Sequence, residues 1–166
     1  EARVSRYLDL ARRTPKSCIV GLEGEVREHL SNRASMRNVL LPESLGFANM
    51  ELESTELVRY LITLDLVIHL VDLAIEDQLI EVKSIMIETP SRGRFKGDSF
   101  ISDYPVKLTI RGHSLPMLHY IQHLSGPGRF VPIRQLHSLG RERGERDENV
   151  MTAVLDLMAL RLRLGS

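Results

Sequence analysis

Two histidines, His119 and His123, stand four residues apart in a stretch with helical periodicity, so both side chains could face one zinc ion. His113 lies near the start of the same stretch. In the zinc-peptidase motif a glutamate that acts as general base follows the first histidine, whereas the residues between this pair are Tyr120–Gln122. We therefore favour two surface histidines beside an apolar helix face, and we predict no metal site.

Carboxylates recur in the stretch from residue 57 to residue 77, and pairs of carboxylates can perform general acid–base catalysis. At helical spacing these side chains form a polar edge opposite an aliphatic face, which favours a solvated surface over a catalytic pair. The residues concerned are Asp65, Asp72, Glu76 and Asp77. His69, in the same stretch, is predicted to be a boundary residue of the helix and not a ligand.

Two further motifs are weaker still. Ser125–Gly128 is rich in glycine, but it has neither the spacing of a phosphate-binding loop nor the Lys-Ser/Thr that follows one, so it predicts a helix end and a tight turn. Cys18, the sole cysteine, has no histidine near it in the sequence and excludes an intrachain disulfide. The sequence therefore predicts no catalytic residue and no cofactor, and we expect a protein that is not an enzyme.

The charge balance argues against nucleic acid as a partner. The chain of 166 residues has 22 basic and 22 acidic residues, whereas nucleic acid and acidic membranes attract clustered positive charge. The basic loop Arg92–Lys96 contains Phe95, and some ferredoxin-like sheets bind RNA through aromatic side chains. The predicted strands offer Tyr104 and Phe130 but no aromatic pair along one strand, so we expect no nucleic-acid binding.

The strand and helix that carry the histidine pair follow from apolar periodicity. Between Tyr104 and Gly112 apolar and polar residues alternate, which predicts a half-buried strand. Ser114 is placed to cap the helix that follows, and Pro116 fits its first turn. The residues expected to face the sheet recur at helical spacing and are Leu115, Leu118, Tyr120, Ile121 and Leu124.

The neighbouring segments complete a repeated unit. A helix capped by Ser54 or Thr55 and a strand over 80–88 precede the strand just described, separated from it by a polar loop over 91–99. After the helix, the run 130–139 is predicted to be a strand with a bulge between Ile133 and Leu136. The run 150–164 contains good helix formers, but the alternation at its end favours a strand.

The sequence therefore predicts an α+β fold of the ferredoxin-like type, made of a duplicated αββ unit. Its four-stranded antiparallel sheet would carry two helices on one face and leave two open edges. We predict a domain over 54–166, with a first αββ unit over 54–112 and a second over 113–166. If 150–164 were helical, the duplication would fail and a three-stranded sheet would remain.

Upstream of this domain we predict an N-terminal helical or coiled-coil arm over 1–41 and a linker over 42–53. The arm shows amphipathic helical patterns over 1–13 and 19–40, with narrow apolar stripes among charged residues. Narrow stripes suit a helix that docks on another surface. We predict that Leu22, Val26 and Leu30 of this arm contribute to a protein–protein interface.

A family resemblance supports this organisation. The run Tyr104–Gly112, the short helix with Leu118–Leu124, and the run Arg129–Ile133 are similar in order and spacing to the periplasmic domain of the PilO family. PilO proteins belong to the inner-membrane assembly platform of type IV pili and resemble in fold the GspM proteins of type II secretion. The resemblance extends over about residues 80–164 and is most specific in the strand that ends at Gly112.

The resemblance implies a non-catalytic structural protein of the bacterial periplasm, held in the inner membrane by an anchor outside this segment. It implies a homodimer, or a heterodimer with a PilN-like sister protein, together with other components of a pilus or secretion platform. The alternative that we consider is a ferredoxin-like regulatory domain that binds a small ligand on its sheet face or helix edge. Association between chains supports the first function, and ligand-induced stabilisation supports the second.

Overall fold

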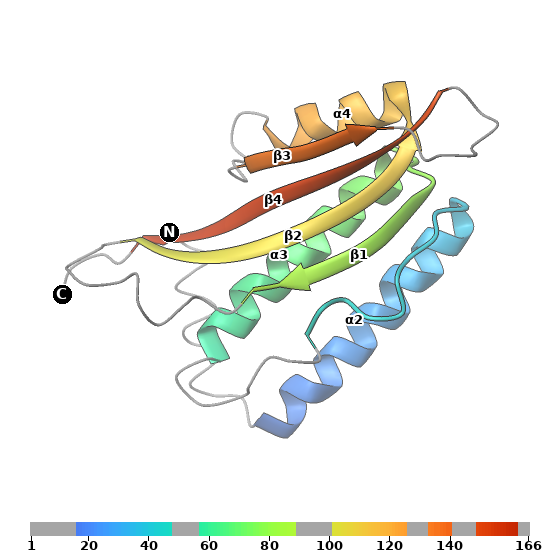
Figure 1. Ribbon diagram of the computed structural model, residues 1–166. Helices are drawn as coiled ribbons and strands as arrows, with labels where there is room; N and C mark the ends of the chain where they lie inside the picture. Colours follow the sequence, from blue (N-terminus) through green and yellow to red (C-terminus); the bar gives the residue numbers. More distant parts are fainter. Residues whose placement is uncertain (1–15, 48–56, 89–100, 126–132, 141–148, 163–166) are drawn as a thin grey trace.

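The computed structural model describes most of the chain (Figure 1). The described residues are 16–47, 57–88, 101–125, 133–140 and 149–162. The predicted helix over 1–13, the caps Ser54 and Thr55, and the loop over 91–99 lie outside them.

The described elements follow the predicted order of helices and strands. They are α2 (Lys16–Met36), α3 (Leu57–Glu76), β1 (Glu81–Ile87), β2 (Ile101–His113), α4 (Ser114–Leu124), β3 (Ile133–Gly140) and β4 (Val150–Leu162). The unit α3, β1, β2 is therefore repeated as α4, β3, β4.

The four strands form one antiparallel sheet in the order β1-β2-β4-β3. The second strand of each αββ unit lies in the centre of the sheet, and the first strand of each unit lies at an edge. Helices α3 and α4 lie on one face of the sheet, and α2 precedes the repeat in the sequence (Figure 1). This arrangement confirms the predicted ferredoxin-like α+β fold.

The pairing of β2 with β4 forms the centre of the sheet. It extends without a break from Ile101 opposite Leu162 to His113 opposite Val150. In β2 the side chains of Val106, Leu108 and Ile110 are buried at alternate positions, as the period-two pattern predicts. In β4 Ala153, Leu155 and Leu157 are buried in the same way, so the preference for a strand over a helix at 150–162 is confirmed.

The edge strand β3 is irregular. Its register against β4 shifts between Ile133 and Gln135 and again between Leu136 and Ser138. The bulge predicted between Ile133 and Leu136 is therefore confirmed, and a second one follows it. Two bulges within eight residues make β3 a twisted edge.

Helix α3 is enclosed on most sides. Its buried side chains include Tyr60, Leu64, Val67, Leu70 and Val71, and they belong to the same buried cluster as the inner faces of β2 and β4. On another side, Leu30 and Ala34 of α2 belong to this cluster, at 1% and 2% exposure. Helix α3 thus lies between the sheet and α2.

Helices α2 and α3 end in the same way. Each is followed by a residue in the left-handed region, Asn38 (φ 56°) after α2 and Gln78 (φ 55°) after α3. In both cases this residue's N–H donates to a carbonyl three residues earlier, and the next N–H donates to a carbonyl five residues earlier, which is the Schellman pattern. The next side chains, Val39 and Leu79, are buried.

The segment after α2 runs along the outer edge of β1. Leu40 forms an isolated parallel bridge with Glu81, and the Val82 N–H donates to the Leu40 carbonyl at 2.8 Å. Further along, Gly46 has φ of 89°, and a Cβ on it would lie 2.7 Å from the carbonyl oxygen of Ile85. This edge of the sheet, predicted to be open, is therefore partly covered by the chain itself.

The first turn of α4 differs from the prediction. The N-cap residue is His113, which makes no side-chain capping bond, and Ser114 is the first helical residue. The Ser114 hydroxyl instead donates to the Asn149 carbonyl at 3.0 Å, and so ties α4 to the start of β4. The predicted capping role of Ser114 is wrong because a tertiary acceptor takes its hydroxyl.

The predicted buried face of α4 is also partly wrong. Leu115 and Leu118 are 63% and 54% exposed, whereas Met117, Tyr120 and Leu124 are buried. Leu115 and Leu118 are three residues apart, and Met117, Tyr120 and Leu124 are three and four apart, so apolar spacing alone did not distinguish the two sets. The contact with α3 selects the face that carries Tyr120.

Candidate functional site

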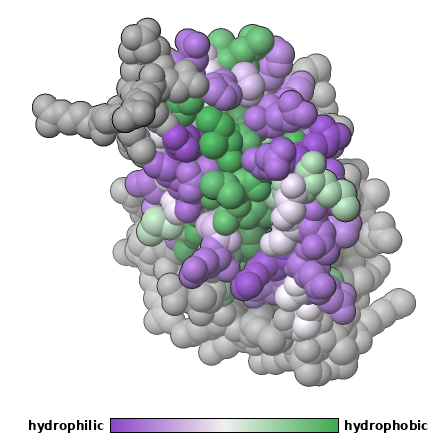
Figure 2. All heavy atoms as spheres, turned by 90° about the vertical axis from the view of Figure 1, so that its right-hand side faces the viewer, coloured by the Kyte–Doolittle hydropathy of each residue, from purple (hydrophilic) through white to green (hydrophobic). Residues whose placement is uncertain are grey.

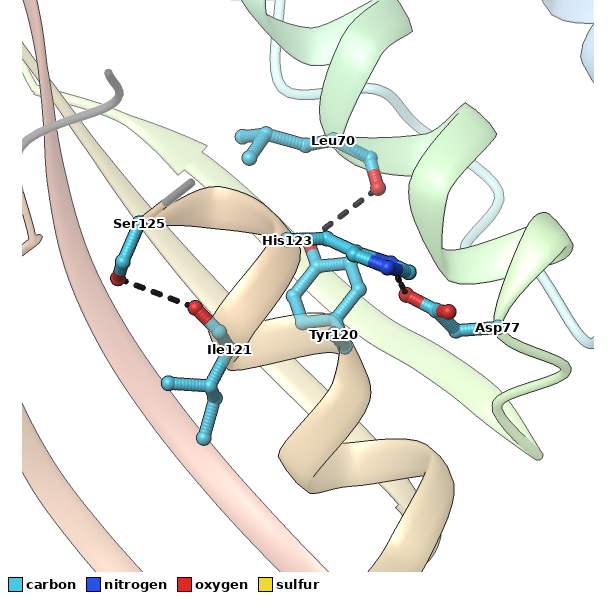
Figure 3. Close-up of polar contacts among 6 residues, drawn as sticks. All are labelled: Leu70, Asp77, Tyr120, Ile121, His123 and Ser125. Atoms are coloured by element: carbon cyan, nitrogen blue, oxygen red, sulfur yellow. Dashed lines mark hydrogen bonds and ion pairs between the residues drawn. The ribbon is translucent and has the colours of Figure 1, made fainter. Parts of the chain in front are cut away.

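The contact between α4 and the end of α3 holds one member of the predicted histidine pair, His123, and one member of the predicted acidic edge, Asp77 (Figure 3). His123 Nδ1 lies 3.0 Å from the Asp77 Oδ2 atom, and the Asp77 side chain is only 7% exposed. The predicted solvated edge is therefore wrong for Asp77. Nearby, the Ser125 hydroxyl donates to the Ile121 carbonyl at 3.1 Å, at the predicted end of the helix.

Tyr120 lies at the centre of this interface and is fully buried. Its hydroxyl donates to the Leu70 carbonyl of α3 at 3.2 Å. Burial raises the pKa of Tyr120 well above its ordinary value, and the nearby Asp77 carboxylate raises that pKa further. A phenol held neutral in this way is a hydrogen-bond donor between two helices, and the geometry assigns it a structural role.

The other candidate ligands do not converge on one point. His119 is exposed on α4, and His113 is exposed at the start of that helix. In the part of the chain that the structure describes, no group of three His, Cys, Asp or Glu side chains is placed to hold a metal ion. His69, predicted to be a boundary residue, is half-buried on α3.

The predicted interface residues of the arm pack within the chain. Leu30 is 1% exposed in the core, and Leu22 and Val26 are partly buried against that core. Leu30 could reach another protein only if α2 separated from α3. The role of Leu22, Val26 and Leu30 in association stays a prediction, and the structure gives all three an intrachain partner.

Two polar contacts connect α2 with α3. The Arg33 guanidinium pairs with the Asp72 carboxylate, so Asp72 is also not a purely solvated residue. Closer to the start of both helices, the Tyr60 hydroxyl donates to the Glu23 carboxylate at 3.2 Å. Burial raises the pKa of Tyr60, and the charge of Glu23 and its hydrogen bond raise that pKa further. Because Glu23 precedes Arg33 as Tyr60 precedes Asp72, the two helices run parallel.

Several large apolar side chains are exposed on the described surface. The large hydrophobic residues above 40% exposure in the described part are Met36, Leu40, Met86, Leu115, Leu118 and Leu136. Figure 2 shows hydrophobic side chains gathered in a band, flanked by hydrophilic ones, at the end where α2 ends and α4 begins. Among the described helices, none is long and apolar enough to cross a bilayer.

Sequence reasoning missed Leu115 and Leu118 as surface residues because it assigned them to the core. One signal was available, because Met117, Tyr120 and Leu124 form a second apolar stripe on the same short helix. Two stripes on an 11-residue helix mean that one of them must face away from the sheet.

Comparisons with known proteins bear on the fold. No family model matches the sequence, and no curated protein shows significant sequence similarity to it. A core domain from Akkermansia muciniphila is similar in structure, with a TM-score of 0.77 at 12% identity, covering 92% of this chain and 91% of that chain. A second structure from this organism has a TM-score of 0.75 at 13% identity, covering 99% and 88%.

A third A. muciniphila structure, solved without its transmembrane region, has a TM-score of 0.73 at 15% identity and covers 92% of this chain and 88% of that chain. At these identities the likeness establishes a shared fold over nearly the whole length of each chain. Membership of the PilO family stays a prediction.

Proposed function

We propose that this chain is the ectodomain of a non-catalytic structural component of a type IV pilus or type II secretion-like assembly platform. In this proposal it lies in the bacterial periplasm, is held in the inner membrane by an anchor outside the segment, and acts by pairing with a second copy or with a PilN-like sister protein.

The observation that carries the proposal is the position of the run on which the PilO resemblance rests. Tyr104–Gly112 is the central strand β2, and it leads directly into α4 at the junction of the two αββ units. Gly112 is buried there, and a Cβ on it would lie 2.9 Å from the Leu79 Cδ2 atom. The most specific part of the resemblance thus coincides with a close contact between the end of β2 and Leu79, the residue shortly before β1.

A second support is the nature of the described surface. The buried side chains of Tyr120 and Asp77 connect α4 with α3 and its end, and six large apolar side chains are exposed among the described residues. Exposed apolar patches are typical of surfaces that bind other proteins. A structural neighbour solved without its transmembrane region is in keeping with an ectodomain.

The proposal is tested by co-purification and by sedimentation. The full-length protein, tagged at its C-terminus, should fractionate with the inner membrane and should retain a PilN-like protein from the same genome, or a second, differently tagged copy of itself. The isolated chain should sediment as a dimer, alone or with that sister protein. The ligand-binding alternative would be supported by two results together. The chain would stay monomeric both alone and with the sister protein, and one compound in a thermal-shift panel of metabolites would stabilise it.

A further inference from the structure

The edge of the molecule formed by α4 and β3 is nearly free of charge. Helix α4 contains no Asp, Glu, Lys or Arg, and β3 contains only Arg134. The whole chain is 27% charged, and at that frequency the 11 residues of α4 and the 8 of β3 would carry about five charged residues. Charged residues are depleted in this way at the centres of protein interfaces.

The exposed leucines of α4 lie on its free side. Tyr120 and His123 contact α3, and at about 100° per residue Leu118 is rotated by roughly 200° and 140° from them. Leu118 therefore points away from α3. Leu115 lies one turn before Leu118, and both are more than half exposed.

The edge strand β3 carries a further exposed leucine. Leu136 pairs with the buried Leu155, so it lies on the face of the sheet that the helices cover, and it is 42% exposed. Within the described residues β3 is hydrogen-bonded only to β4, whereas the opposite edge, β1, is partly covered by the segment containing Leu40. Among the described residues the two edges of the sheet thus differ, because the segment with Leu40 runs along β1 and no segment pairs with the outer side of β3.

We propose that the α4–β3 edge, defined by Leu115, Leu118 and Leu136, is the surface on which a second copy of this chain docks. This inference rests on the proposed function, and it replaces the arm by the α4–β3 edge as the site of self-association. A two-fold axis at this edge pairs β3 with its counterpart in antiparallel fashion and sets the two α4 helices side by side.

Charge favours a second copy as the occupant. Homodimer interfaces are on average more apolar than interfaces between different proteins, and α4 contains no Asp, Glu, Lys or Arg. Two identical surfaces without charged residues meet with no like-charge repulsion, and apolar side chains cover one another.

The test is sedimentation velocity on the whole chain with two matched double variants. Leu115→Glu with Leu118→Glu adds charge to the α4–β3 edge, and Met36→Glu with Met86→Glu adds the same charge at methionines that are 81% and 58% exposed elsewhere. We expect the dimer dissociation constant to rise by about tenfold or more in the leucine variant and to stay within about twofold in the methionine variant. Circular dichroism should show that all three proteins are equally folded.

Hydrogen exchange supplies an independent measurement. Amides of β3 in the wild-type chain should become more protected as the protein concentration is raised through the dissociation constant, and those of α2 should not. Two results together would overturn the docking surface while leaving self-association intact. Amides of α2 would become more protected with concentration, and the leucine variant would still dimerise. A wild-type chain that is monomeric at all concentrations would overturn both self-association and this surface.

Discussion

Replacing Tyr120 by phenylalanine removes one hydroxyl from the interface between α3 and α4. This hydroxyl is fully buried and donates to the Leu70 carbonyl at 3.2 Å. The Leu70 carbonyl lies within α3 and keeps its helical partner, so the substitution leaves no buried acceptor without a donor. We therefore expect the loss of one net hydrogen bond, about 1 kcal/mol in the free energy of unfolding, and a fall in Tm of about 2–4 °C.

The same substitution should change how stability depends on pH. The folded state raises the pKa of Tyr120, so above pH 10 the unfolded chain releases this proton first. The stabilisation is fully present below pH 10, and it is lost progressively as the pH rises above that value. The Tyr120→Phe variant lacks this proton, so its stability should decline less steeply above pH 10 than that of the wild type.

Urea unfolding followed by circular dichroism, at pH 7 and between pH 10 and 11, measures both effects. Tyr60→Phe is the matched comparison, because the pKa of Tyr60 is also raised and this residue lies at a different contact, between α2 and α3. Each variant should flatten the alkaline decline, and the double variant should flatten it most. An alkaline decline in Tyr120→Phe equal to that of the wild type would show that the hydroxyl is not buried in the folded chain.

Substitutions at three further places test the packing. Gly21→Ala with Gly24→Ala, at helical positions where a Cβ meets no other atom, should raise the free energy of unfolding by about 1–2 kcal/mol in urea titrations; a loss of stability would place these glycines outside a helix. Thr63→Val removes a fully buried hydroxyl that has no hydrogen-bond partner and should stabilise the folded chain by about 1 kcal/mol. Thr63→Ser keeps the hydroxyl and should destabilise the folded chain. The reverse order of the two variants in thermal melts would indicate a partner for the hydroxyl. Gly46→Ala should lower Tm by several degrees, because its Cβ would meet the Ile85 carbonyl at a positive φ, and an unchanged Tm would contradict that contact.

The strands were predictable because their signal is local. Alternation in Val106, Leu108 and Ile110 of β2 reports burial on one face whatever the partner strand is. The same argument decided residues 150–162, where good helix formers competed with an alternating pattern. A strand in the centre of a sheet is buried by its neighbours, and that burial outweighs intrinsic helix propensity.

The position of the arm was only partly predictable. Its narrow stripe indicated a helix that docks on another surface, and α2 does dock, with Leu30 and Ala34 in the core. Its partner is α3 of the same chain, which the sequence did not reveal because Arg33 and Asp72 are 39 residues apart. The acidic edge was misjudged for a related reason, since Asp77 finds His123 46 residues away.

The sequence by itself determined the order of helices and strands, the duplicated αββ unit and the bulge in β3, because each depends on the spacing of neighbouring residues. Only the tertiary structure decided which side of α4 is buried. Its two apolar stripes have the same spacing, and the choice between Leu118 and Tyr120 depends on α3, whose Leu70 carbonyl accepts the tyrosine hydroxyl. That choice leaves Leu115 and Leu118 on the surface, where we propose that a second copy binds.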